Sequence, residues 1–397
     1  MPGVVVDHWY GTVRRMAVAT SADAPFPIIS ITGAPYERGV AYGEQARERI
    51  ERSLRFYADQ VVPTLDVTFG QLCDGVMAHR DRWHEADPEI VDEIEGIAAG
   101  SGLSVAEILF LNTRGAFVLP PAEAPDGGQR DDGCSSFAVL PRAARNGHML
   151  TGQNWDYLAG IQDTVVLLHV RPQNGPTQLM IMEAGQVGRH GMNSAGVGMH
   201  ANGLGSRLRN PAAIPSTFMR RRILRASGIT AAIDAAITPP RAGSTNLVIS
   251  HRSGFAVDIE TTPETIRWFY PTDGWLFHTN HFLVEIPPKI ADSYAPSADS
   301  ILRYGRAIEL MRAAAERGGI GQEDLVNVLS DHLGDGFGLC SHADLTAGEH
   351  ERWCTVATVI SDLTEGVMSV AAGPPCEGSF VDISLETGRV MSSARTG

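Results

Sequence analysis

The sequence lacks the local motifs by which several common enzyme classes are recognised. It contains no GxSxG turn, no GxxxxGK[ST] loop, no HExxH pair and no well-placed GxGxxG. These motifs position, in turn, a serine nucleophile, a nucleoside triphosphate, a catalytic zinc ion and a dinucleotide. A serine hydrolase, a nucleotide-dependent enzyme and a zinc protease therefore lack local support.

Cysteine is scarce, and its spacing is irregular. The five cysteines are Cys73, Cys134, Cys340, Cys354 and Cys376. An odd number without a regular spacing argues against a disulfide scaffold, and no CxxC pair indicates zinc. We therefore expect no metal and no other cofactor.

Basic residues and long apolar runs are also few. The 32 Lys and Arg residues against 46 Asp and Glu give a net charge of −14, which repels phosphate backbones and anionic membrane surfaces. The arginine cluster at 220–225 is too short and too helix-like to carry nucleic-acid binding. No secretory signal is evident at the N-terminus, and no run reaches membrane-spanning length. We expect a cytoplasmic protein with neither nucleic-acid nor membrane partners.

The sequence does contain an ordinary globular balance, with 43% hydrophobic and 20% charged residues over 397 positions. This length fits one large domain or two smaller ones. Spacings of three and four predict helices over 43–61, which Pro63 ends, over 90–97, and after a capping box at Ser104 and Glu107. Further helices are expected after Ser216 and Pro296. Strands are expected at 164–171, 178–183, 247–250, 256–260, 355–362 and 366–371, so the layout is α+β.

A loose Gly- and Pro-rich stretch over 120–133 precedes Cys134, where the pattern changes to strands. The turn Asn146-Gly147 predicts a tight hairpin that brings 154–156 back beside Cys134. If the Gly133–Cys134 bond breaks, Cys134 gains an α-amine with a pKa of about 7.7–8.0 that can take the proton from its own thiol. The alternative is a buried structural cysteine.

Four polar residues are candidates for the rest of such a site. Asp156 could accept hydrogen bonds from the Cys134 amine, or cap a turn or helix. Asn193 and Asn280 could each donate to an oxyanion, although an asparagine beside glycines, as at 193, also suits a left-handed turn. Arg352 could steady a carboxylate, or be an ordinary surface residue. The pair His278 and His281 has no third ligand at a sensible spacing for a metal.

The motifs at 132–136 and 152–156 resemble those of the acyl-coenzyme A:6-aminopenicillanic acid (isopenicillin N) acyltransferase-like family of N-terminal nucleophile hydrolases. Further similar segments lie at 33–39, 183–185, 191–197, 278–282 and 373–376. The resemblance implies a four-layer αββα sandwich, made as a precursor that cuts itself before Cys134. It implies a small subunit over 1–133 and a large subunit over 134–397 that stay together as one domain.

Carried over by position, Cys134 matches the family's nucleophile, Asp156 its neighbouring aspartate and Asn280 its oxyanion asparagine. Asn193 and Arg352 match by analogy with the related bile-salt and penicillin V amidases. In addition to these, we expect Ser136, Asn154 and Trp155 to contact substrate. One departure is that Ser341 follows Cys340, where family members often carry arginine.

We therefore predict an autoprocessed cysteine amidohydrolase that cleaves a linear amide of a small molecule through an acyl-thioester on Cys134. Its partners would be this substrate and its own cleaved subunit. Acyl transfer to an amine is the first alternative, and a non-catalytic amide binder is the second. A third is an uncut cysteine peptidase with His278 or His281 as base.

Overall fold

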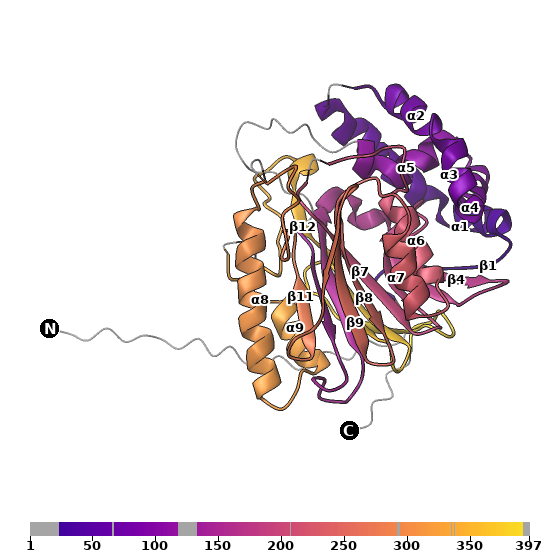
Figure 1. Ribbon diagram of the computed structural model, residues 1–397. Helices are drawn as coiled ribbons and strands as arrows, with labels where there is room; N and C mark the ends of the chain where they lie inside the picture. Colours follow the sequence, from indigo (N-terminus) through magenta and orange to yellow (C-terminus); the bar gives the residue numbers. More distant parts are fainter. Residues whose placement is uncertain are drawn as a thin grey trace.

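Two β-sheets lie face to face in the computed structural model of the chain (Figure 1). The structure describes residues 24–65, 67–117, 133–206, 208–291, 294–334, 336 and 338–391. The larger sheet has the order β1-β4-β5-β6-β7-β8-β9-β10, and the smaller one has the order β11-β2-β3-β12-β13-β14. Neighbouring strands are antiparallel except β1 and β4, which are parallel.

The strands of the larger sheet are β1 (Ile28–Gly33), β4 (Val165–Pro172), β5 (Gln178–Glu183), β6 (His190–Asn193), β7 (Val197–Gly203), β8 (Thr245–His251), β9 (Phe255–Thr261) and β10 (Ile266–Phe269). Those of the smaller sheet are β11 (Trp275–His278), β2 (Ser135–Val139), β3 (Leu150–Leu158), β12 (Trp353–Asp362), β13 (Val367–Ala372) and β14 (Val381–Ser384).

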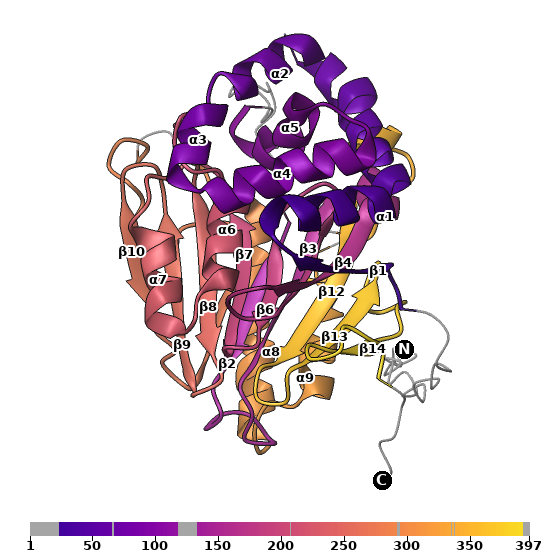
Figure 2. The ribbon, with the colours of Figure 1, turned by 90° about the vertical axis from the view of Figure 1, so that its right-hand side faces the viewer.

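Helices cover the outer face of each sheet. Helices α6 (Ser216–Arg225) and α7 (Ile229–Ile237) contact β6, β7 and β8, and helices α8 (Ala298–Glu316) and α9 (Gln322–Leu329) contact β11 and β12 (Figures 1 and 2). Between the sheets, β2 and β3 contact β7. The layer order is helices, sheet, sheet, helices, which confirms the expected αββα sandwich.

Side-chain alternation in β2 separates two cores. Phe137 and Val139 join a cluster with residues of α8 and α9, whereas Ala138 belongs to the core shared by the two sheets. Successive side chains of a strand point to opposite faces. Ser135 therefore faces α8 and Ser136 faces the larger sheet.

The N-terminal helices form a cover at one end of the sandwich, seen at the top of Figure 2. They are α1 (Pro35–Phe56), α2 (Phe69–Met77), α3 (Arg80–Ala86), α4 (Pro88–Ser101) and α5 (Val105–Phe117). A Cβ added at Gly39, Gly43, Gly96 or Gly100 would lie 2.1–2.4 Å from a backbone oxygen of the facing helix. Only glycine permits this approach of α1 to α4.

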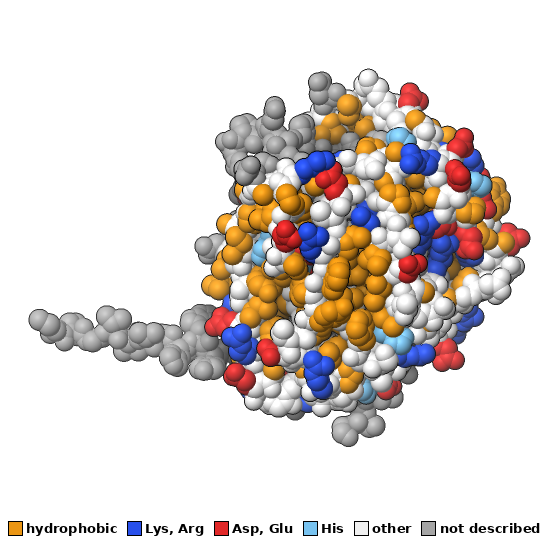
Figure 3. Space-filling view, viewed as in Figure 1, with side chains coloured by type: hydrophobic (Ala, Val, Ile, Leu, Met, Phe, Trp, Pro, Cys, Tyr) orange, Lys and Arg blue, Asp and Glu red, His pale blue; other side chains and the backbone are white. Residues whose placement is uncertain are grey.

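Helix α8 has one face turned into the molecule and one turned outward. Arg303 is 2% exposed, whereas Ile301 and Leu302 are 51% and 40% exposed. Figure 3 shows hydrophobic side chains gathered on the face that carries this helix, between charged ones. Within the described ranges, no helix is both long enough and apolar enough to cross a membrane.

The expected elements are present with shifted bounds, and one turn was predicted wrongly. The first helix begins at Pro35 instead of Gly43, and α4 ends at Ser101, capped by Gly102 with φ +78°. Val139 pairs with Leu150, so a ten-residue connection, not a two-residue Asn-Gly turn, joins β2 to β3. Inside this connection Ala144 bridges to Ile320, which holds the chain away from a tight turn. The expected loop over 120–133 lies, except for Gly133, outside the described residues.

Candidate active site

Cys134 lies directly before β2 and is fully buried. Its Sγ lies 3.7 Å from the backbone oxygen of Asp156, to which the thiol donates a hydrogen bond. The register of Ser135 opposite Asn154 produces this proximity, because it places the start of β2 beside the middle of β3. The hairpin pairing predicted from the sequence is confirmed.

Gly133 lies so close to the Asp156 side chain that a residue with a Cβ at this position would force neighbouring atoms to shift. A Cβ added at Gly133 would lie 2.9 Å from Asp156 Cβ and 3.0 Å from its Oδ2. The peptide before Cys134 and the Asp156 carboxyl group are therefore in contact range. Asp156 itself is 2% exposed.

Arg303 connects Cys134 with Asn280. One guanidinium nitrogen donates to the Cys134 carbonyl oxygen at 3.0 Å and to Ser135 Oγ at 2.9 Å. The other terminal nitrogen donates to Asn280 Oδ1 at 2.9 Å and to Asp299 Oδ2 at 3.0 Å. The planar fork of an arginine suits such simultaneous contacts, so the relative position of Cys134 and Asn280 is fixed through one side chain.

Asn280 is held at its backbone as well. Its N–H donates to Ser300 Oγ at 2.8 Å, and its Nδ2 donates to the Gly203 carbonyl at 3.1 Å. With Oδ1 occupied by Arg303, the orientation of the side-chain amide follows: Oδ1 faces α8 and Nδ2 faces β7. The amide retains a second N–H on Nδ2.

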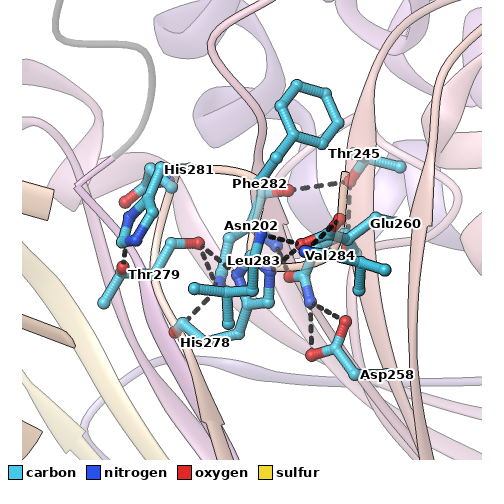
Figure 4. A network of polar contacts seen from close by, with 12 residues as sticks. Asn202, Thr245, Asp258, Glu260, His278, Thr279, His281, Phe282, Leu283 and Val284 are labelled. Atoms are coloured by element: carbon cyan, nitrogen blue, oxygen red, sulfur yellow. Dashed lines mark hydrogen bonds and ion pairs between the residues drawn. The ribbon is translucent and has the colours of Figure 1, made fainter. Parts of the chain in front are cut away.

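A buried polar network backs this group from the larger sheet (Figure 4). Asn202 donates to Ser136 Oγ at 3.0 Å and to the His278 and Thr279 carbonyls at 3.0 and 2.9 Å. His278 Nε2 lies 3.0 Å from Glu260 Oε1, and Asn246 donates to both Asp258 oxygens at 2.8 and 2.7 Å. Hydrogen bonds thus connect the start of β2 with β7, and they connect β11 with β9.

The charges of this network are coupled. Burial raises the pKa of Asp258 to about 7, against the lowering effect of His278 and Asn246. Burial also disfavours the His278 imidazolium, but the carboxylates of Asp258 and Glu260 outweigh it and raise the pKa of His278. Burial lowers the pKa of His281 to about 4, and the neighbouring His278 and Arg303 add to this.

The comparison with protein families decides the identity of the chain. The model of the family described as Acyl-coenzyme A:6-aminopenicillanic acid acyl-transferase matches residues 142–376, more than half of the sequence. The chain belongs to this family. The match includes Asp156, Asn280 and Arg303 and begins eight residues after Cys134.

Individual proteins give the same picture. This acyl-transferase family member is 29% identical over 291 residues to the "Acyl-coenzyme A:6-aminopenicillanic-acid-acyltransferase 40 kDa form" of Emericella nidulans. That alignment covers 71% of this chain and 76% of the relative. The expected resemblance to this family, made from the motifs around Cys134, is confirmed.

Two solved structures are similar at lower sequence identity. A mutant of the conjugated bile acid hydrolase from Clostridium perfringens is 14% identical, covers 66% of this chain and 97% of its own, and gives a TM-score of 0.46. Penicillin V acylase from Agrobacterium tumefaciens is 12% identical, covers 64% and 87%, and gives a TM-score of 0.44. The layer order of the family member itself, described above, defines its fold.

The residues expected to contact substrate differ in their surroundings. Ser136 accepts from Asn202, as described. Asn154 donates to the Leu329 and Leu339 carbonyls at 2.9 and 2.7 Å and accepts from Thr358 Oγ1 at 2.7 Å. The Asn154 amide is thus hydrogen-bonded to the C-terminal residue of α9 and to the backbone at Leu339. Trp155 is fully buried between the sheets, with the Arg189 guanidinium 4.1 Å from its ring centroid.

The structure does not join Asn193 and Arg352 to this group through any contact among the described residues. Asn193 donates to the Leu224 and Ala226 carbonyls, both at 2.9 Å, and accepts from Val197 N at 3.0 Å. Arg352 donates to the carbonyls of Ala347 and Leu345, both at 3.1 Å. Both side chains hold backbone segments.

Sequence reasoning missed Arg303. It lies in an ordinary amphipathic helix, and its signal was weak: an arginine on the buried stripe of α8, in line with Ala307 and Met311. Metal-binding side-chain types come together in the described part of this acyl-transferase family member at His332, Cys340, His342 and Cys376, outside the group around Cys134.

Proposed function

We propose that this chain is an autoprocessed cysteine amidohydrolase whose nucleophile is Cys134. The observation that carries the proposal is the Arg303 side chain, which contacts the carbonyl of Cys134 and the amide of Asn280 together. A thiol nucleophile needs an oxyanion donor at a fixed position relative to it. Arg303 is a positioning residue in this scheme, and Cys134 and Asn280 are the catalytic residues.

Maturation begins with attack of Cys134 Sγ on the Gly133 carbonyl carbon. The Gly133–Cys134 C–N bond breaks as the C–S bond forms, and the Cys134 nitrogen takes up the thiol proton. Water then hydrolyses the thioester, which leaves a carboxylate at Gly133 and a free amine and thiol at Cys134. The two products are chains 1–133 and 134–397. The contact range between Gly133 and Asp156 supports this site, because it places the carboxyl group near the position of the new amine.

Turnover uses the same thiol. The Cys134 amine accepts the thiol proton, Sγ attacks the substrate amide carbonyl, and the second Nδ2 N–H of Asn280 together with a backbone N–H stabilises the oxyanion. The protonated amine of Cys134 gives its proton to the leaving amine. Water then hydrolyses the acyl-thioester and releases the acid. Asp156 lies beside this thiol through its backbone oxygen.

Acyl transfer is the second candidate, and family membership favours it. The chemistry is identical up to the acyl-thioester, after which an amine attacks in place of water. The two outcomes separate when an acyl amide is incubated with the mature protein in the presence and absence of a primary amine. A new amide that forms in preference to free acid identifies a transferase, and free acid alone identifies a hydrolase.

The test of the proposal is Cys134→Ala beside Cys73→Ser, which removes a half-buried thiol of α2. We expect Cys73→Ser to mature into two fragments, seen by intact mass, and to turn over acyl amides. Cys134→Ala should remain one chain, form no acyl adduct and hydrolyse nothing. An intact Cys134→Ala protein with full amidase activity would refute the assignment.

The same experiment addresses the remaining alternatives. A wild-type chain that stays whole, binds an acyl amide and releases no product is the binder. An active wild-type chain that stays whole is the uncut peptidase. The geometry disfavours His278 as the base of that peptidase, since both of its ring nitrogens have partners, Glu260 and the Thr279 carbonyl.

A further inference from the structure

Four side chains with strong metal-binding character meet beside the candidate active site. The Sγ atoms of Cys340 and Cys376 and ring nitrogens of His332 and His342 all lie within 4.8 Å of one another. Cys340 and His342 come from the segment that follows α9, and Cys376 comes from the turn after β13. Neither segment has a part in the mechanism above.

Three of the separations between these atoms match the edges of a tetrahedron around a metal ion, and that between the two histidine nitrogens is slightly shorter. The two Sγ atoms are 3.5 Å apart, and His342 Nε2 lies 3.5 Å from Cys340 Sγ and 3.3 Å from Cys376 Sγ. The Nε2 atoms of His332 and His342 are 3.1 Å apart. Zinc with bonds of about 2.3 Å to sulfur and about 2.0–2.1 Å to nitrogen requires ligand separations of about 3.3–3.8 Å.

We propose that His332, Cys340, His342 and Cys376 bind one zinc ion as a closed, structural Cys₂His₂ site. Two thiolates and two imidazoles are the ligand set that zinc takes in such sites. Binding requires each thiol to lose its proton, so two protons leave and the two thiolates neutralise the ion. With four protein ligands, no coordination position remains open for substrate or water.

The outer partner of His342 supports this assignment. His342 Nδ1, the ring nitrogen that faces away from the cluster, lies 3.5 Å from Glu377 Oε1. A zinc-bound histidine typically gives its other N–H to a carboxylate, which fixes its tautomer and orientation. Glu377 follows Cys376 directly, so the turn after β13 supplies both a ligand and the partner of another ligand.

The site would fix a segment that borders β3. Asn154 Nδ2 donates to the Leu339 carbonyl. The Ser341 N–H donates to Thr355 Oγ1 at 3.0 Å, and the Ser341 carbonyl accepts from the Thr355 N–H at 2.9 Å. Thr355 lies opposite Asp156 in the β3–β12 register. A zinc ion here clamps this segment to the 373–377 turn and stiffens β3 from outside. Ser341, the departure from the family pattern, lies between two ligands and faces β12.

The site escaped sequence reasoning because its ligands are widely spaced. Only Cys340 and His342 are near in sequence, and the CxxC spacing that marks many zinc sites is missing. The sequence-based expectation of no metal is replaced by this proposal.

The test is the metal content of the full chain, purified without chelators, by plasma mass spectrometry. We expect about one zinc per wild-type chain, retained in Cys73→Ser and in Cys134→Ala. We expect the metal to be lost in Cys376→Ser, an exposed position whose change should leave the fold, measured by far-ultraviolet circular dichroism, intact. Replacement by cobalt(II) should give thiolate charge-transfer bands in the wild type and weaken them in Cys376→Ser.

A second variant keeps every ligand. Glu377→Gln should bind zinc about 10–100-fold more weakly in a chelator competition, without change in stoichiometry. The proposal is overturned if the wild type, dialysed against zinc, holds no more metal than Cys376→Ser. It is equally overturned if intact mass finds Cys340 and Cys376 two hydrogens lighter, as a disulfide, in metal-free active protein. Retention in Cys134→Ala separates this result from any failure of the proposed catalysis.

Discussion

Two clusters of polar side chains lie on either side of Asn154, and they are built differently. The cluster around Cys134 contains its own cation, Arg303, which is bonded to Cys134, Ser135, Asn280 and Asp299. The cluster of His332, Cys340, His342 and Cys376 brings together two thiol sulfurs and two imidazole nitrogens, each a potential metal ligand. Asn154 joins the two, because it lies opposite Ser135 and bonds the carbonyl of Leu339.

The difference teaches which cluster can be complete without an added group. Buried polar groups are stable when each has a partner of the opposite character. The fork of Arg303 satisfies three acceptors from distant parts of the chain. The thiols and imidazoles of the second cluster lie within hydrogen-bond distance of one another, and a cation could bind all four of them at once.

The largest effect should come from removal of the internal cation. Arg303→Met keeps the side-chain length but leaves the Asn280 and Cys134 oxygens without their donor. Truncation of one partner in a buried ionic network typically destabilises by about 3–5 kcal/mol. We expect a loss of that size in the free energy of unfolding by urea, together with loss of self-cleavage.

Two matched variants sharpen this prediction. Arg306→Met, one turn along α8, breaks part-exposed pairs with Asp331 and Glu309 and should change stability by less than about 1 kcal/mol. Arg303→Lys retains the positive charge but lacks the planar guanidinium group. It should therefore restore the free energy of unfolding more fully than it restores kcat. Equal effects of Arg303→Met and Arg306→Met would contradict the special role of the first cluster.

Next in size is Asn280→Ala. Removal of one oxyanion donor should lower kcat by about 10²–10³-fold with little change in KM. Steady-state kinetics on an acyl amide checks this, and zinc content should stay at the wild-type level. An unchanged kcat would remove Asn280 from the mechanism and leave Arg303 as a purely structural residue.

Asn154→Ala tests the connection between the clusters, and Asn193→Ala is its matched control. Both asparagines are buried, donate to two carbonyls and accept one hydrogen bond, so each variant should lose about 1–3 kcal/mol of stability. Only Asn154→Ala should also weaken zinc retention and turnover. If Asn193→Ala lowers kcat at equal stability, the sequence-based prediction of a catalytic Asn193 gains its support.

The smallest effect concerns the network behind Ser136. The pKa of Asp258 rises from 3.8 to about 7 on folding because the carboxyl group is buried. The folded chain then holds more protons than the unfolded chain over that range, so stability falls as pH rises. Asp258→Asn should remove at most about 1.4 kcal/mol per pH unit of this slope. Urea unfolding of both proteins at pH 5, 6 and 7 measures it.

Residues that are adjacent in sequence or repeat at a regular period were predicted well. The capping box at Ser104 has all its hydrogen bonds, and β5 has the bounds expected from the sequence. The Asn146-Gly147 turn failed because Ala144 pairs with a distant segment at Ile320, which local chemistry does not reveal. Arg303 and the Cys340 cluster escaped prediction for the same reason.

The sequence alone determined the strand change at Cys134, the α+β layout and the family, because periodicity and short motifs are local properties of the chain. Only the tertiary structure decided which side chains share a site. Arg303 lies 169 positions from Cys134, and Cys376 lies 36 positions from Cys340. Contacts at such separations depend on the packing of whole layers, which no local pattern encodes.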